Sequence, residues 1–146
     1  MGRDGARAGR VGGVTTVTRS GLDAVLAASR HGVRRLTPVE LAASSGALVV
    51  DTRTEAQRRR QGELPGAVVI DRTVLEWRLD PTSPNRIPEA DARPRIVVVC
   101  RQGFSSSLAA RSLRDLGLDA TDVVDGVEGW LAAGLPMTRE PADVRE

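Results

Sequence analysis

The sequence predicts an α/β fold, in which a small parallel β-sheet is flanked by helices on both faces. Short apolar runs at 47–50, 67–70 and 96–99 are typical of buried strands, because strands covered by helices on both sides lack polar alternation. Helix start signals and helical spacing separate these runs. The crossovers are short, which favours neighbouring strands in one parallel sheet.

The length and composition suit one globular domain. The chain has 146 residues, of which 40% are hydrophobic, and it contains 15 Gly. No apolar run approaches the roughly 20 residues that a membrane span needs, and the arginines at the N-terminus are not followed by an apolar signal segment. We therefore expect no contact with a membrane.

Positive charge is concentrated near the N-terminus, and every basic residue is Arg. Residues 1–35 hold seven Arg against two acids, whereas residues 36–146 hold 14 Arg against 17 acids. We predict a disordered basic arm over 1–20 and a short helical extension over 21–35. No aromatic residues are interleaved with the arginines, so a solvated arm is favoured and no nucleic-acid partner is expected.

The first half of the domain contains two helices and two strands. Thr37 to Glu40 is a capping box with Pro at the first helical position, so a helix begins there. The apolar run at 47–50 continues to Asp51, a carboxylate that forms the last residue of the predicted strand. Thr54 to Gln57 repeats the capping pattern and predicts an Arg-rich, exposed helix before the strand at 67–70.

The second half continues the alternation. Thr73 to Leu79 predicts a helical turn, and the four prolines between residues 81 and 94 predict a surface loop. The strand at 96–99 comes next. The remaining predicted elements are a helix with its apolar face at 108–116, a strand at 121–124, a helix at 126–133 and a loose tail at 139–146. Trp77 and Trp130 are expected to pack in the core or at its rim.

The strand at 96–99 ends in Cys100, the only cysteine of the chain. A polar loop follows, and helical spacing begins after Ser105. This order places the thiol at the carboxyl edge of the sheet, facing a helix N-terminus, where open α/β sheets bind ligands. The helix dipole and a nest of backbone amides favour the thiolate, which is the reactive form. Cys100 is therefore a candidate nucleophile.

The residues after Cys100 suit an anion-binding loop. Gly103 permits a tight curve, Arg101 supplies a positive charge, and Ser105 and Ser106 offer hydroxyls for hydrogen bonds to sulfur or oxygen. Phe104 is expected to cover the core. From these residues alone, a reactive thiol and a cysteine that merely packs in the core remain equally open.

Other catalytic classes lack their motifs. The chain has no GxxxxGK[ST], GxGxxG or GxSxG pattern, and one Cys forms neither an internal disulfide nor a zinc site. A Cys-based phosphatase places an Arg six residues after the Cys to bind phosphate, but position 106 is Ser, which counts against that class. A single thiol fits a reducing compartment, so we expect a cytoplasmic location.

Several short segments occur in an order and spacing that is more specific than any one of them. They are Leu36-Thr37-Pro38, Val50 to Arg53, Gly62 to Ala67, Cys100 to Ser105, Gly126 to Trp130 and Gly134-Leu135-Pro136. With these segments the chain resembles the single-domain rhodaneses, a family of sulfurtransferases. The resemblance implies a rhodanese-like domain over 36–138, and the α/β fold of that family agrees with the predicted alternation.

The resemblance also implies the reaction. Cys100 would take a sulfane sulfur from a small anionic donor such as thiosulfate, carry it as a persulfide, and pass it to a thiol or cyanide without a cofactor or metal. The implied substrate-binding loop consists of Arg101, Gln102, Gly103, Phe104 and Ser105, with Asp51, Arg53 and Ser106 as supporting residues. For Asp51 and Arg53, a buried pair that fixes the end of the strand is the favoured interpretation.

Two positions depart from the family pattern. Glu63 stands where the family usually has His in a segment thought to be structural, so we expect little effect on catalysis. The loop ends without the Arg that many members carry, which leaves the donor anion to the amides, Arg101 and the serines. The alternative function is a module that binds or senses sulfur without turnover, followed by a phosphatase or an arsenate reductase. The oligomeric state is left open.

Overall fold

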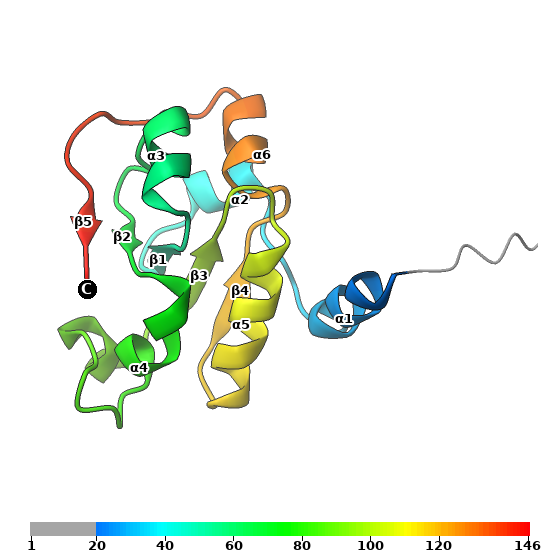
Figure 1. Ribbon diagram of the computed structural model, residues 1–146, viewed down its shortest axis with the longest axis vertical. Coiled ribbons are helices and arrows are strands. Elements are labelled where there is room, and N and C mark those ends of the chain that lie inside the picture. Colours follow the sequence, from blue (N-terminus) through cyan, green and yellow to red (C-terminus); the bar gives the residue numbers. More distant parts are fainter. Residues whose placement is uncertain (1–19) are drawn as a thin grey trace, which may run out of the picture.

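A computed structural model describes residues 20–146, and all but one residue of the arm predicted over 1–20 lies outside this range. In this part of the chain five parallel strands form one sheet, in the order β4-β3-β1-β2-β5 (Figure 1). The strands are β1 Leu48–Asp51, β2 Val68–Val69, β3 Ile96–Val99, β4 Ala120–Asp122 and β5 Asp143–Val144. The predicted parallel sheet is confirmed.

Within residues 20–146, six α-helices connect or flank these strands. They are α1 Gly21–Arg30, α2 Pro38–Ala43, α3 Glu55–Gln61, α4 Leu75–Leu79, α5 Ser105–Asp115 and α6 Gly126–Ala132, with 3₁₀ turns at Arg72–Val74 and Pro88–Ala92. Both predicted capping boxes are present, one at Thr37 and Glu40 and the other at Thr54 and Gln57. The start signals in the sequence therefore determine where α2 and α3 begin.

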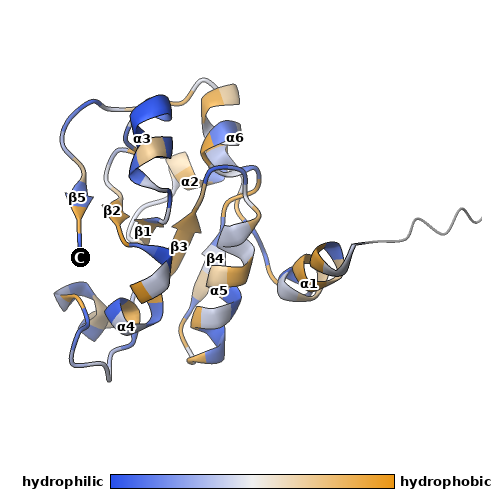
Figure 2. Ribbon diagram, viewed as in Figure 1, coloured by the Kyte–Doolittle hydropathy of each residue, from blue (hydrophilic) through white to orange (hydrophobic). Residues whose placement is uncertain are grey.

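The central strand β3 is buried along its whole length and divides the core into two layers. Ile96 and Val98 belong to one apolar cluster with α4 and α5, while Val97 and Val99 belong to a second cluster with α2 and α6. Figure 2 shows the central strand β3 as hydrophobic, whereas the helices around the sheet carry both hydrophilic and hydrophobic residues. An unbroken Val/Ile run results because both faces of the strand contact helices.

The C-terminal tail differs from the prediction of a loose segment over 139–146. Asp143–Val144 form β5, which pairs in parallel with Val68–Val69 at the edge of the sheet. Arg145 then donates to Asp143 and to Glu89. An uncovered edge strand offers free N–H and C=O groups for such pairing. Two exposed residues are too few to produce an alternating apolar pattern, so the sequence gives no signal for β5.

The loop over 81–94 needs correction, and the two tryptophans differ in burial. The loop predicted over 81–94 contains the 3₁₀ turn Pro88–Ala92, and Ile87 and Ala90 are buried in the core. Trp77 is 56% exposed, so it does not pack in the core, whereas Trp130 is buried and its Nε1–H donates to the Pro136 carbonyl at 2.9 Å.

Residues 20–35, called the N-terminal extension below, lie against the domain. Leu26 and Ser29 of α1 are buried, and Arg114 of α5 donates to the Ser29 carbonyl at 2.6 Å. Thr121 of β4 donates to the Arg34 carbonyl at 2.8 Å. Figure 1 shows α1 on the side of α5 that is remote from α3. None of the helices in the described range is long and apolar enough to cross a membrane.

Candidate active site

Cys100 follows the last residue of β3 and therefore lies at the carboxyl edge of the sheet, as the sequence predicts. The first amides of α6 hold the turn that follows it: the Val127 N–H donates to the Cys100 carbonyl at 2.9 Å, and the Glu128 N–H donates to the Arg101 carbonyl at 3.0 Å. Residues 100–105, the Cys100 loop, then lead directly into α5. The N-termini of α5 and α6 thus meet at the Cys100 loop.

The sulfur takes part in two hydrogen bonds. The Gly103 N–H donates to Sγ at 3.1 Å, and the Cys100 thiol donates to Ser106 Oγ at 3.2 Å. Burial is the largest single influence on the pKa of the Cys100 thiol and raises it. The Ser106 and Ser105 hydroxyls and the amides of Ser106 and Gly103 together outweigh burial, so the pKa lies below its ordinary value. These contacts favour the nucleophilic thiolate.

A buried carboxylate that sequence reasoning missed lies behind the loop. Ser106 Oγ and Ser107 Oγ both donate to Asp122 Oδ2, at 2.7 and 2.8 Å. Arg35 Nε donates to Asp122 Oδ1 at 2.8 Å, and the Asp122 side chain is only 3% exposed. We call these four residues the Asp122 cluster. Asp122 ends β4 and has no motif in its sequence surroundings, so only the fold reveals it.

Two arginines of the N-terminal extension reach the loop as well. Arg30 Nη2 donates to the Gly103 carbonyl at 2.7 Å, and Arg35 Nη2 donates to the same oxygen at 2.9 Å. Arg30 Nε also donates to Ser107 Oγ at 2.9 Å. In the sequence these two arginines belong to an excess of positive charge over residues 1–35, and nothing there indicates which groups they bind.

The mouth of the site is a pocket of about 250 Å³. Its lining consists of Thr52, Gln57, Cys100, Arg101, Gln102, Phe104 and Ser105. Arg101 forms a half-exposed ion pair with Glu128 of α6 at 3.0 Å. Phe104 is 54% exposed, so it does not cover the core as expected but lines the pocket.

Asp51 and Arg53 form a buried ion pair at the end of β1. Arg53 Nη2 donates to Asp51 Oδ2 at 2.8 Å and to the Gly62 carbonyl at 3.0 Å, and both side chains are almost fully buried. Neither residue lines the pocket at Cys100. The pair fixes the turn between β1 and α3, and Thr52, which lies between the two residues, is the one that reaches the pocket.

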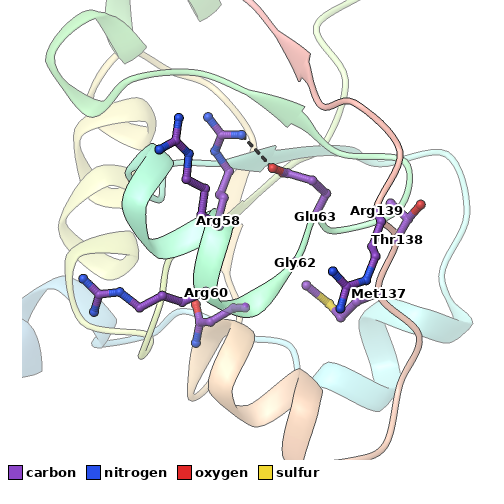
Figure 3. Close-up of a pocket in the computed structure, with 9 residues that line it drawn as sticks. Arg58, Arg60, Gly62, Glu63, Met137, Thr138 and Arg139 are labelled. Carbon is purple, nitrogen blue, oxygen red and sulfur yellow. Dashed lines mark hydrogen bonds and ion pairs between the residues drawn. The ribbon is translucent and has the colours of Figure 1, made fainter.

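A second pocket, of about 340 Å³, lies beside the end of α3 and is rich in arginine. Figure 3 shows Arg58 paired with Glu63 there, with Met137 and Arg139 on the segment that passes opposite. Its lining contains no cysteine, serine or histidine. Among residues 20–146, no three His, Cys, Asp or Glu side chains are grouped so that they can hold a metal ion.

Comparisons with known proteins agree with this geometry. Residues 37–133, well over half of the chain, match the family model of the rhodanese-like domain. A protein of unknown function from Rhodopseudomonas palustris, described as a possible tyrosine phosphatase, is 29% identical with a TM-score of 0.74, and the match covers 87% of this chain and 100% of that one. No curated protein matches the chain.

Two further solved structures share the fold. A rhodanese-like domain protein from Staphylococcus aureus is 25% identical with a TM-score of 0.54, and the match covers 73% of this chain and 99% of that one. A thiosulfate sulfurtransferase from Pseudomonas aeruginosa is 23% identical with a TM-score of 0.57. That match covers 76% of this chain but only 21% of the larger protein.

Proposed function

The chain belongs to the rhodanese-like domain family, and we propose that it is a sulfurtransferase whose Cys100 carries sulfur as a persulfide. The observation that carries this proposal is the environment of the thiol. The Gly103 amide and the Ser106 hydroxyl contact the sulfur, and the pKa of Cys100 is lowered. A low thiol pKa supports nucleophilic attack at neutral pH.

The proposed donor is a small anion such as thiosulfate. The Cys100 thiolate attacks the outer sulfur of thiosulfate, a new S–S bond forms at Sγ, and the S–S bond of the donor breaks. Sulfite leaves with the electron pair of that bond, so the persulfide keeps one negative charge. Backbone amides of the Cys100 loop and the guanidinium of Arg101 at its rim are the groups that would hold these anions.

The second half of the cycle returns the free thiolate. A thiolate or cyanide attacks the outer sulfur of the persulfide, and Cys100 leaves as the thiolate, so no proton, metal or electron carrier is required. This two-step transfer predicts ping-pong kinetics. One cysteine without a resolving partner fits a reducing compartment, and we place the reaction in the cytoplasm.

Intact-protein mass spectrometry tests the proposal directly. Incubation with thiosulfate should add the mass of one sulfur atom, and Cys100→Ser should abolish the gain; because the chain has one Cys, the site of modification is unambiguous. Addition of cyanide should remove the extra mass and release thiocyanate. No mass gain with thiosulfate or any other sulfane donor rejects the proposal. A persulfide that neither cyanide nor a dithiol discharges supports the alternative, a module that binds or senses sulfur.

A phosphatase is the second candidate, because the Rhodopseudomonas palustris protein is described as a possible tyrosine phosphatase. The position that would carry the phosphate-binding Arg is Ser106, and its hydroxyl is bound to Asp122. A serine hydroxyl there cannot bind a phosphate dianion in the bidentate way that an arginine does. Hydrolysis of para-nitrophenyl phosphate that is lost in Cys100→Ser would favour this candidate.

A further inference from the structure

We propose that the N-terminal extension is a working part of the active site, and that Arg30 and Arg35 are positioning residues for the Cys100 loop. Both arginines precede the matched domain at 37–133, yet both contact the loop that carries the thiol. The role assigned to them rests on the proposed sulfur transfer. The contacts that support it are independent of which molecule donates the sulfur.

The extension is fastened to the domain at several points, so its arginines are held in place. Arg114 of α5 binds the Ser29 carbonyl near the C-terminal end of α1, where a cation is favourable. The Leu36 N–H donates to the Asp122 carbonyl at 3.0 Å, and the Val124 N–H donates to the Leu36 carbonyl at 2.8 Å. These two bonds add the segment after Arg35 to the outer edge of β4.

The two guanidinium groups fix the orientation of one peptide unit. Arg30 and Arg35 both donate to the Gly103 carbonyl. A trans peptide is planar, with its C=O and N–H on opposite sides, so the Phe104 N–H of the same unit is turned away from the arginines. The preceding unit points the Gly103 N–H at the sulfur, 3.1 Å away. The arginines therefore hold the curve of the loop on which that amide depends.

Arg35 also neutralises a carboxylate that lies close to the sulfur. Asp122 Oδ2 is 2.7 Å from Ser106 Oγ, and Ser106 Oγ is 3.2 Å from Sγ. A buried negative charge at that range disfavours a thiolate or a persulfide anion, unless a cation compensates it. Arg35 compensates the charge of Asp122. With Arg30 included, the three side chains Asp122, Arg35 and Arg30 carry one net positive charge. Of the other charged groups at this edge, Asp51 is paired with Arg53, and Arg101 is paired with Glu128. Asp125 adjoins Gly103 just before α6.

The variants Arg35→Ala, Arg30→Ala and the double variant Arg35→Ala/Asp122→Asn test the inference in the full-length protein. Arg34→Ala is the matched control, because its side chain is 80% exposed and pairs with Glu40 away from the loop. Two rates are measured as a function of pH: alkylation of Cys100 by iodoacetamide, and persulfide formation with thiosulfate. Thermal melting reports the stability of each variant.

We expect Arg35→Ala to lower both rates at neutral pH about tenfold or more relative to Arg34→Ala. The Asp122 carboxylate would then lie near the sulfur without its cation, and a nearby charge shifts the pKa of a thiol by about one unit or more. The alkylation profile should move to higher pH. In the double variant the profile should move back, since the uncompensated carboxylate is gone, and a merely structural role for Arg35 would not produce this rescue. Arg30→Ala should shift the profile in the same direction without creating an unpaired carboxylate.

Profiles and rates in Arg35→Ala and Arg30→Ala that equal those of Arg34→Ala overturn the inference. If Arg35→Ala does not fold, Arg30→Ala decides alone, since Asp122 keeps its partner in that variant. If the wild-type protein takes no sulfur from thiosulfate, the proposed function fails. The alkylation profiles still decide the role of the extension, because they require only the thiol.

Discussion

Gly126, the first residue of α6, should be the least replaceable glycine of the site. Its backbone has a φ of 54°, and a Cβ there would lie 2.8 Å from the carbonyl carbon of Arg101 and 2.8 Å from the Gly103 nitrogen. It would lie closer still to the Cys100 carbonyl oxygen. All three neighbours are backbone atoms of the Cys100 loop, so none can rotate away. Gly126→Ala therefore forces the loop and the start of α6 apart.

The magnitude follows from two separable costs. An alanine in the left-handed region costs about 1–2 kcal/mol. Overpacking against atoms that cannot move aside adds about 1–3 kcal/mol. Gly134, just after α6, has a φ of 71° but nothing within 4 Å of its Cβ position, so Gly134→Ala incurs only the first cost. The difference between the two variants isolates the contact with the loop.

Urea unfolding of both variants measures these free energies, and iodoacetamide alkylation at neutral pH measures the state of the thiol. We expect Gly126→Ala to lose about 1–3 kcal/mol more than Gly134→Ala. We also expect it to slow alkylation, because the Gly103 amide is displaced from the sulfur. Equal free energies of unfolding and equal alkylation rates in the two variants would refute the reasoning.

Two other substitutions test the remaining parts of the site. Ser106→Ala removes the hydroxyl that contributes most to the lowered pKa of Cys100, so this pKa should rise and alkylation at neutral pH should slow. Ser112→Ala on the same helix is the control, and an unchanged pH profile of alkylation in Ser106→Ala contradicts the assignment. Arg53→Ala leaves Asp51 buried without its partner and should cost about 3–5 kcal/mol in urea unfolding. Arg59→Ala, which breaks an exposed pair with Glu55, is the control and should cost at most about 0.5 kcal/mol. Equal losses in the free energy of unfolding would show that burial of the Asp51–Arg53 pair is unimportant.

The sequence predicted those parts of the fold that local signals encode. Capping boxes at Thr37 and Thr54 define the starts of α2 and α3, and the Val/Ile run at 96–99 identifies β3 because both of its faces are covered. It did not predict β5, whose two residues gain their structure only from the free edge of β2. Local patterns cannot report a pairing that depends on which edge remains open.

The same distinction applies to the site. Cys100, Gly103 and Ser106 lie within seven residues of one another, so the strand, the turn and the following helix placed them together from the sequence alone. Arg35 and Asp122 are 87 residues apart, and neither belongs to a motif. An arginine in a basic N-terminal stretch resembles any solvated charge until the fold supplies its partner.

The placement of charge around the thiol favours sulfur transfer over phosphoryl transfer. A Cys-based phosphatase needs a guanidinium at the end of the loop that binds the oxygens of the phosphoryl group in bidentate fashion. In this chain that position is Ser106, and its hydroxyl is oriented by Asp122 behind the sulfur. Arg30 and Arg35 contact the loop through the Gly103 carbonyl and do not line the pocket. Such an arrangement stabilises a single negative charge on the sulfur itself, which is what a thiolate and the proposed persulfide carry in turn.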